Sequence, residues 1–215
     1  FEPVDRRTLE RVFDSFGLVL GRADFEMRFD RDSTSSRTHL PAELTTFLGR
    51  DRDVTQISTT LSMSRLVTLT GPGGVGKTRI AIRVAREHSH MYRDGVWFFD
   101  LSTIAGTAPL AFFVASWLGL QDTPGSSGES SIYRHLADKS ALLIMDNCEH
   151  VREAAAALCR ELLERCSSLK IVATSREPLQ LPGESVYRVA PLDMPPEEGR
   201  TTVEQARRYD AIRFF

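Results

Sequence analysis

The sequence is poor in cysteine and has no long hydrophobic run, and each absence excludes a class of protein. Its 215 residues include three cysteines, an odd number without CxxC spacing, which excludes a disulfide framework. The apolar run LAFFVASWLGL ends after eleven residues, whereas a membrane-spanning helix needs roughly 20. No signal-peptide pattern is present. We therefore expect a cytoplasmic protein without membrane contact, whose cysteines are small core residues.

An excess of charge and a metal-binding spacing of histidines are also missing. The formal net charge of −2 gives no electrostatic reason to bind nucleic acid unaided. His88 and His90 are two residues apart and cannot share one helix face. The other three histidines have no matching ligands, so zinc is not expected. The chain begins at Phe1 and ends inside the pattern AIRFF, and we expect it to be a fragment of a longer protein.

The hydrophobic pattern that is present alternates between strands and helices. Segments rich in leucine and β-branched residues predict strands at 65–70, 95–101, 141–145, 169–174 and 185–190. Amphipathic or apolar segments predict helices at 51–62, 77–88, 108–120, 131–138 and 149–166. This alternation predicts an α/β fold with a parallel sheet of about five strands and helices on both faces.

Three segments flank the main domain, which we expect at 42–195. We expect a helical segment at 1–27, a polar linker at 28–41, and the start of a second helical domain at 196–215.

The segment GPGGVGKT fits the pattern G-x-x-x-x-G-K-[ST] at every position. Its glycines let successive backbone N–H groups turn toward phosphate oxygens, and the helix that follows directs its positive dipole end at the same anion. The lysine supplies a cation for the β- and γ-phosphates, and the threonine hydroxyl can ligate magnesium. The motif predicts a P-loop NTPase that binds ATP or ADP with Mg²⁺. The predicted nucleotide-binding residues here are Gly71, Pro72, Gly73, Gly74, Val75, Gly76, Lys77, Thr78 and Arg79.

The third predicted strand runs directly into Asp146 in the segment ALLIMDNCEH. The carboxyl ends of parallel strands line the ligand crevice of an open sheet, so Asp146 can hold magnesium together with Thr78. The alternative is a solvated aspartate that only ends the strand. Asn147 follows where many nucleotide-hydrolysing proteins have a glutamate, and an amide cannot act as a base at neutral pH. Glu149 has two interpretations, a helix-capping or dipole-pairing residue or a group that activates water.

The segment ATSRE follows the fourth predicted strand and places Arg176 at the same edge of the sheet. A planar guanidinium matches phosphate oxygens, so Arg176 is a candidate sensor of the γ-phosphate. The alternative is a surface arginine paired with Glu177 or with solvent. The candidate catalytic residues are therefore Asp146, Arg176 and Glu149.

Several segments together resemble the nucleotide-binding domain of bacterial STAND (NB-ARC-type) ATPases, many of which are large transcriptional regulators. They are LPAELTTFLGRDRDV, RLVTLTGPGGVGKTRIAIRVA, DGVWFFDL, LLIMDNCEH, KIVATSREPL and GESVYRVAPL. The resemblance covers residues 40–192. It implies that the adenine and ribose lie against Phe47, Leu48, Gly49 and Arg50. It also makes residues 1–27 similar to the end of a helix-turn-helix domain.

The resemblance implies a switch in which ATP opens the molecule and ADP keeps it closed. It also implies downstream helical, winged-helix and repeat domains, self-association in the ATP state, and DNA contact only through a domain outside the main fold. A switch needs tight binding but benefits from slow hydrolysis, which fits Asp146 followed by Asn147. The alternatives are a P-loop ATPase or kinase with fast turnover, and an interaction module with a vestigial loop.

Overall fold

A six-stranded parallel sheet forms the centre of the computed structural model, which describes residues 38–43, 47–104, 110–120 and 128–192. The strand order is β1-β3-β4-β5-β2-β6, and all pairs are parallel. The strands are β1 (Thr38–His39), β2 (Leu66–Thr70), β3 (Gly95–Asp100), β4 (Ala141–Asp146), β5 (Lys170–Ser175) and β6 (Glu184–Arg188). The predicted parallel α/β fold is confirmed.

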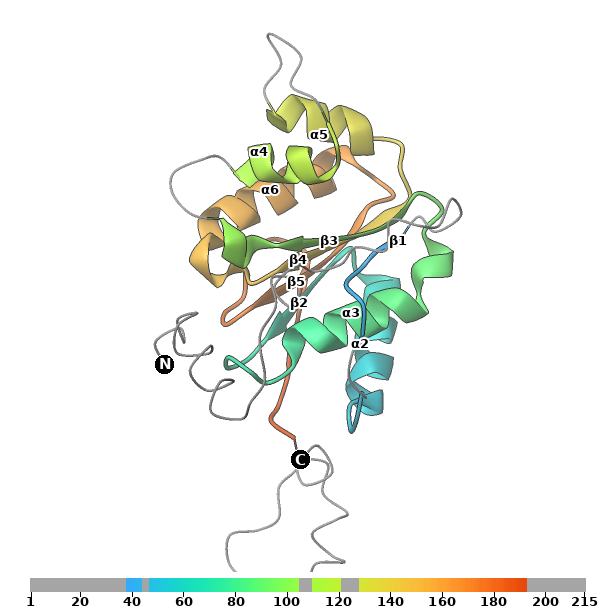
Figure 1. Cartoon of the computed structure of the whole chain (residues 1–215), viewed down its shortest axis with the longest axis vertical. Helices are drawn as coiled ribbons and strands as arrows, with labels where there is room; N and C mark the ends of the chain where they lie inside the picture. Colours follow the sequence, from blue (N-terminus) through green and yellow to red (C-terminus); the bar gives the residue numbers. More distant parts are fainter. Residues whose placement is uncertain (1–37, 44–46, 105–109, 121–127, 193–215) are drawn as a thin grey trace, which may run out of the picture.

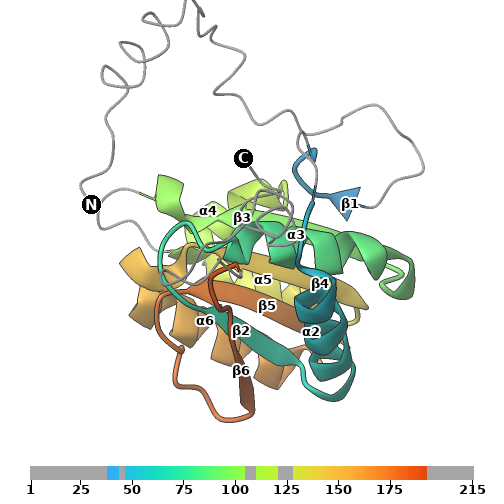
Figure 2. The ribbon, with the colours of Figure 1, turned by 90° about the horizontal axis from the view of Figure 1, so that it is seen from below.

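Helices cover both faces of this sheet (Figure 1). One face carries α2 (Asp51–Met63) and α3 (Lys77–Glu87), and the other carries α4 (Leu110–Trp117), α5 (Gly128–Leu136) and α6 (Arg152–Arg165). Figure 2 shows the same two layers from below. Short 3-10 turns lie at η2 (Ser89–Met91), η3 (Leu101–Thr103) and η4 (Cys148–His150).

The sheet divides the hydrophobic core into two clusters. Alternate residues of β4 show this, because Leu143 and Met145 pack under α4, α5 and α6, whereas Leu142 and Ile144 pack under α2 and α3. Every residue of β4 is buried, as expected for a central strand covered on both sides. This burial fixes the position of Asp146, the last residue of β4.

The three cysteines lie in the first of these clusters, as predicted. Cys148, Cys159 and Cys166 are buried free thiols. Burial raises the pKa of the Cys159 thiol to about 12, so it behaves as a small apolar core group.

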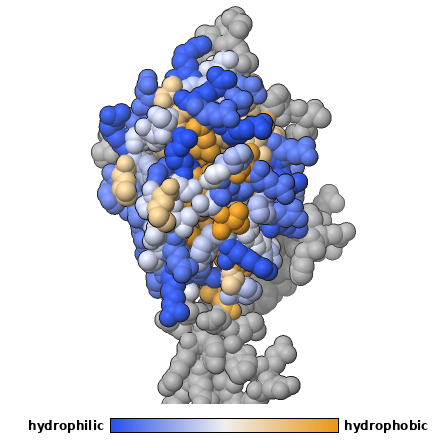
Figure 3. Space-filling view, turned by 180° about the vertical axis from the view of Figure 1, so that it is seen from behind, coloured by the Kyte–Doolittle hydropathy of each residue, from blue (hydrophilic) through white to orange (hydrophobic). Residues whose placement is uncertain are grey.

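The described surface is mainly hydrophilic, although Phe112 and Trp117 of α4 are exposed apolar side chains. Figure 3 shows the side opposite to Figure 1, where hydrophilic side chains surround a limited strip of hydrophobic ones. None of the helices in the described ranges combines the length and the apolar character that crossing a membrane requires.

Two of the differences between the structure and the sequence prediction concern the sheet and the residues that follow β4. The short strand β1 lies inside the segment predicted as a linker, where Thr38 and His39 pair with Val96 and Trp97 of β3. The helix predicted from residue 149 begins at Arg152, because Asn147 has a left-handed backbone and a 3-10 turn intervenes. The predicted segments 1–27 and 196–215 lie outside the described residues.

Candidate functional site

The phosphate loop connects β2 to α3 and curls in a way that needs glycine. Gly76 precedes α3 with φ 97°, and Gly71 has φ 147°; both conformations are strained for residues with a Cβ. A Cβ added to Gly71 would lie 2.8 Å from the carbonyl oxygen of Val189. The loop therefore packs closely against the chain just after β6.

Lys77 is the first residue of α3, and its ammonium group lies inside the loop. Its side chain is buried, with the residue only 8% exposed, and Nζ donates to the carbonyl oxygens of Gly71 and Pro72 at 3.0 Å each. Burial lowers the pKa of Lys77, and the carboxylates of Glu149 and Asp146 act against that shift. The Lys77 ammonium thus lies against the loop backbone, as its predicted contact with phosphate requires.

Thr78 and Asp146, which the sequence predicts as metal ligands, are in direct contact. The Thr78 hydroxyl lies 2.7 Å from Oδ1 and 3.0 Å from Oδ2 of Asp146. The Thr174 hydroxyl donates to Oδ1 at 2.5 Å. Asp146 is 2% exposed; burial raises its pKa, and the bonds from Thr174 and Thr78 lower it. The carboxylate and two hydroxyls are hard oxygen donors.

Asn147 connects this carboxylate to an acid that the sequence reasoning missed. The side-chain nitrogen of Asn147 donates to Oδ2 of Asp146 and to Oδ1 of Asp100, at 3.0 Å each. Asp100 ends β3 and pairs in register with Asp146 across the sheet. The sequence feature that could have identified Asp100 is its position near the end of the strand segment GVWFFDL, because parallel strands bring their carboxyl ends together.

Arg176 and Glu149 lie at the same edge of the sheet and face each other. Nε of Arg176 is 3.6 Å from Oε1 of Glu149, whereas Glu177 lies near Arg152 instead. A guanidinium nitrogen of Arg176 lies 3.9 Å from where a Cβ on Gly73 would stand, which places it beside the phosphate loop.

The carboxylate of Glu149 is only partly paired. Its Oε2 is buried and has no hydrogen-bond partner among the described residues. The N-cap of α6 is Val151, so Glu149 does not cap that helix, and its pairing with the helix dipole stays a prediction.

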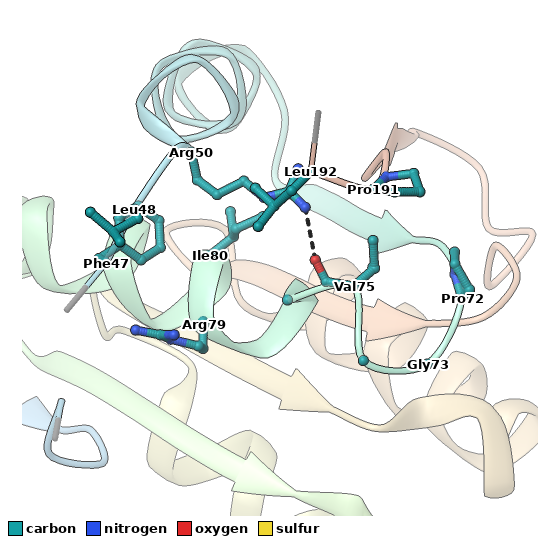
Figure 4. A pocket seen from close by; sticks show the side chains of 12 residues that line it. Phe47, Leu48, Arg50, Pro72, Gly73, Val75, Arg79, Ile80, Pro191 and Leu192 are labelled. Carbon is teal, nitrogen blue, oxygen red and sulfur yellow. Dashed lines mark hydrogen bonds between the residues drawn. The ribbon is translucent and has the colours of Figure 1, made fainter. Parts of the chain in front are cut away.

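A cavity of about 400 Å³ adjoins the phosphate loop (Figure 4). Phe47, Leu48 and Arg50, for which the resemblance implies contact with adenine and ribose, line one side of it, and Arg79 also lines it. Ile80, Pro191 and Leu192 were not predicted but complete the wall, together with loop residues 72–76. Gly49 lies between the lining residues Leu48 and Arg50, and its own backbone has φ 68°. The apolar side chains suit a planar ring, and the adjoining loop suits phosphates.

Arg50 joins the cavity to the phosphate loop. Its Nη2 donates to the carbonyl oxygen of Val75 at 3.0 Å, the bond drawn in Figure 4. Its Nη1 pairs with Asp53 at 3.1 Å, and Asp53 accepts a 2.6 Å bond from the hydroxyl of Tyr187 on β6. Burial and Asp53 raise the pKa of Tyr187 to about 12, so its hydroxyl remains a donor at neutral pH.

We expect Tyr187→Phe to weaken ADP binding roughly two- to fivefold, because at most about 1 kcal/mol of the support for Arg50 is lost. Calorimetry measures the affinity. Tyr133→Phe is the matched control, since Tyr133 lies on the opposite face of the sheet, under Arg165. Equal ADP affinities in Tyr187→Phe and wild type would show that the bond to Asp53 does not support the site.

Known proteins with similar sequences are longer than this chain. An uncharacterized protein of Mycobacterium tuberculosis is 37% identical over 174 residues, which cover 81% of this chain and 43% of that protein. A second M. tuberculosis protein, provisionally named an HTH-type transcriptional regulator, is 43% identical over 148 residues, which cover 69% of this chain and 17% of that protein. The chain thus spans less than half the length of these curated relatives.

Two further comparisons concern the fold and the family of the chain. The crystal structure of Cdc6p from Pyrobaculum aerophilum superposes with a TM-score of 0.51 at 14% identity, covering 70% of this chain and 48% of that one. The family model described as "NB-ARC domain" matches residues 50–179, a range that includes the phosphate loop, Asp146 and Arg176. The chain therefore belongs to the NB-ARC domain family.

Proposed function

We propose that this chain is the ATP/ADP-binding switch module of a longer, cytoplasmic signalling ATPase that regulates transcription. The observation that carries the proposal is the direct contact of Thr78 with Asp146 beside the phosphate loop. The HTH-type name of one relative supports the regulatory part. DNA contact then belongs to a domain outside residues 42–195, and self-association to the ATP-bound form.

The polar groups of the site fit a magnesium ion bound together with a nucleotide. Mg²⁺ takes few protein ligands and completes its octahedron with phosphate oxygens and water. Thr78 and Asp146 supply one hydroxyl and one carboxylate, and the described residues contain no cluster of three or more His, Cys, Asp or Glu side chains able to hold a metal. When bound, Mg²⁺ neutralises charge on the β- and γ-phosphates.

Each part of the nucleotide has a matching surface in this proposal. The base occupies the apolar cavity between Phe47 and Leu192. The phosphates accept hydrogen bonds from the loop backbone and from Lys77. Arg176 lies beside Gly73 and contacts the γ-phosphate, which only ATP has, so ATP and ADP differ in their contacts with the residue that follows β5.

Asp146→Asn tests the metal assignment, because it preserves shape but removes charge. We expect ADP binding without magnesium to persist, and the strengthening of binding by Mg²⁺ to fall at least about tenfold, because even loss of an outer-shell partner of a ligand costs roughly 10–100-fold in metal affinity. Calorimetry with and without Mg²⁺ measures both. Asp138→Asn is the control, since Asp138 is an exposed aspartate after α5. An unchanged magnesium response in Asp146→Asn would remove Asp146 from the metal site.

A further inference from the structure

Two aspartates that end neighbouring strands create an electrostatic problem at the proposed metal site. Asp100 and Asp146 are directly paired in the register of β3 and β4. Two carboxylates at this spacing repel each other, more strongly because Asp146 is buried. A hydrogen-bond donor placed between the two carboxylates would offset this repulsion.

The side chain of Asn147 is a hydrogen-bond donor that lies between the carboxylates of Asp100 and Asp146. Its amide nitrogen has two hydrogens, and it lies 3.0 Å from Asp100 Oδ1 and 3.0 Å from Asp146 Oδ2. The opposite orientation of the amide would turn its oxygen toward both carboxylates, so the contacts fix the orientation. An aspartate or glutamate at position 147 would have no hydrogen to donate and would add a third negative charge.

The backbone of Asn147 is specialised as well. It has φ 59° and ψ 46°, a left-handed conformation that asparagine tolerates better than most residues. Its N–H donates to the Thr174 hydroxyl at 3.0 Å, and the same hydroxyl donates to Asp146. Both the main chain and the side chain of Asn147 thus connect to the groups that hold the Asp146 carboxylate.

Asp100 is fixed from its own side of the contact. Its Oδ1 also accepts a hydrogen bond from the N–H of Ser102 at 3.0 Å, as the cap of the turn η3. Oδ1 of Asp100 is therefore held by two donors, the N–H of Ser102 and the side chain of Asn147.

We propose that Asn147 and Asp100 act together as positioning residues for the magnesium-binding carboxylate of Asp146, a role that rests on the proposed function. Asn147 holds Oδ2 of Asp146, Thr174 holds Oδ1, and Thr78 on the phosphate loop completes the contacts. Asn147 is then a clamp, a residue that holds the Asp146 carboxylate in place, which explains why position 147 does not carry a second acid.

The test compares how Mg²⁺ strengthens ADP binding across a set of variants of the 215-residue chain. Asn147→Gly removes the clamp and suits the left-handed backbone, and Asp100→Ala removes the acceptor. We expect each to raise the Mg²⁺ concentration at half effect about tenfold, as loss of an outer-shell partner does. The double variant should lose no more than either single variant, because the two residues act as one unit.

Asp100→Asn separates positioning from charge. Its amide oxygen can still accept from Asn147 and Ser102, so we expect a magnesium response within about twofold of wild type. If Asp100→Asn fails as badly as Asp100→Ala, the charge of Asp100 acts directly and the positioning role is wrong. Melting temperatures that fall in Asn147→Gly, with the Mg²⁺ midpoint unchanged, show a purely structural bond and also overturn the inference.

The wild-type and Asp146→Asn proteins separate this inference from the proposed function. If ADP binding to wild type does not respond to Mg²⁺, the proposed function itself fails. If Asp146→Asn loses the response but Asn147→Gly retains it, the metal site stands and only the clamp is wrong.

Discussion

Lys77→Ala is expected to weaken ADP binding at least about tenfold, because a charge-assisted hydrogen bond to phosphate contributes roughly 1.5–3 kcal/mol. The structure favours a large effect, since Lys77 is already enclosed by the loop and bound to Gly71 and Pro72. Little side-chain freedom remains to be lost when a phosphate binds. Titration calorimetry with ADP measures the change directly.

Two variants serve as controls for this experiment. Lys139→Ala removes the same charge from a loop before β4, away from the phosphate loop, and should leave ADP affinity unchanged. Lys77→Arg keeps the charge but enlarges the head group, and should bind more weakly than wild type because the enclosed position fits one ammonium group. If Lys77→Ala binds ADP as wild type does, GPGGVGKT is not a phosphate loop in this chain.

The central strands and the phosphate loop could be predicted from sequence because their signals are local. Five apolar residues of β4 in succession, Ala141 to Met145, indicate a strand buried on both faces. The phosphate-binding geometry belongs to consecutive residues and needs no distant partner. The contact of Thr78 with Asp146 followed from topology, since both lie at the carboxyl edge of the sheet.

The cavity and its supporting bonds could not be predicted in the same way. The placement of Phe47 and Arg50 beside the loop came from resemblance, because no periodicity links residues 47–50 to 71–78. Tyr187 contacts Asp53 across 134 positions in the chain, and such a side-chain bond depends on the packing of β6 against α2. Pro191 and Leu192 line the cavity for the same reason.

The start of α6 was misplaced because a local conformation overrode helix propensity. The sequence from Glu149 onward is helical in pattern, but Asn147 takes φ 59° to reach Asp100 and Asp146. This turn moves the helix start to Arg152 and leaves Glu149 facing Arg176. The difference from prediction therefore lies at the proposed site, where local preference and function compete.

Wild-type protein is expected to hydrolyse ATP below about one turnover per minute, against roughly 10 per second for a typical enzyme. The reason lies in the groups that could activate water. Both hydrogens of the Asn147 amide lie against carboxylates, and Asn147 cannot take a proton. Among the candidate catalytic residues named from the sequence, the one that could take a proton from water is Glu149, whose Oε1 faces Arg176 at 3.6 Å. A phosphate-release assay, with Lys77→Ala protein purified identically as the blank, measures the rate.

Glu149→Gln decides between a slow switch and an ordinary ATPase. The substitution keeps the size of the side chain but removes the charge that faces Arg176, and the buried Oε2 of Glu149 has no hydrogen-bond partner among the described residues. If the protein is a switch, Glu149→Gln should change the low rate by less than about fivefold, since no general base is lost.

Asn147→Glu should not create a fast enzyme, because it replaces the donor between Asp100 and Asp146 with a third carboxylate. A wild-type rate of several per second that Glu149→Gln abolishes would identify Glu149 as the base. The chain would then be a turnover ATPase, and the buried unpaired oxygen of Glu149 would be the atom that accepts the proton from water.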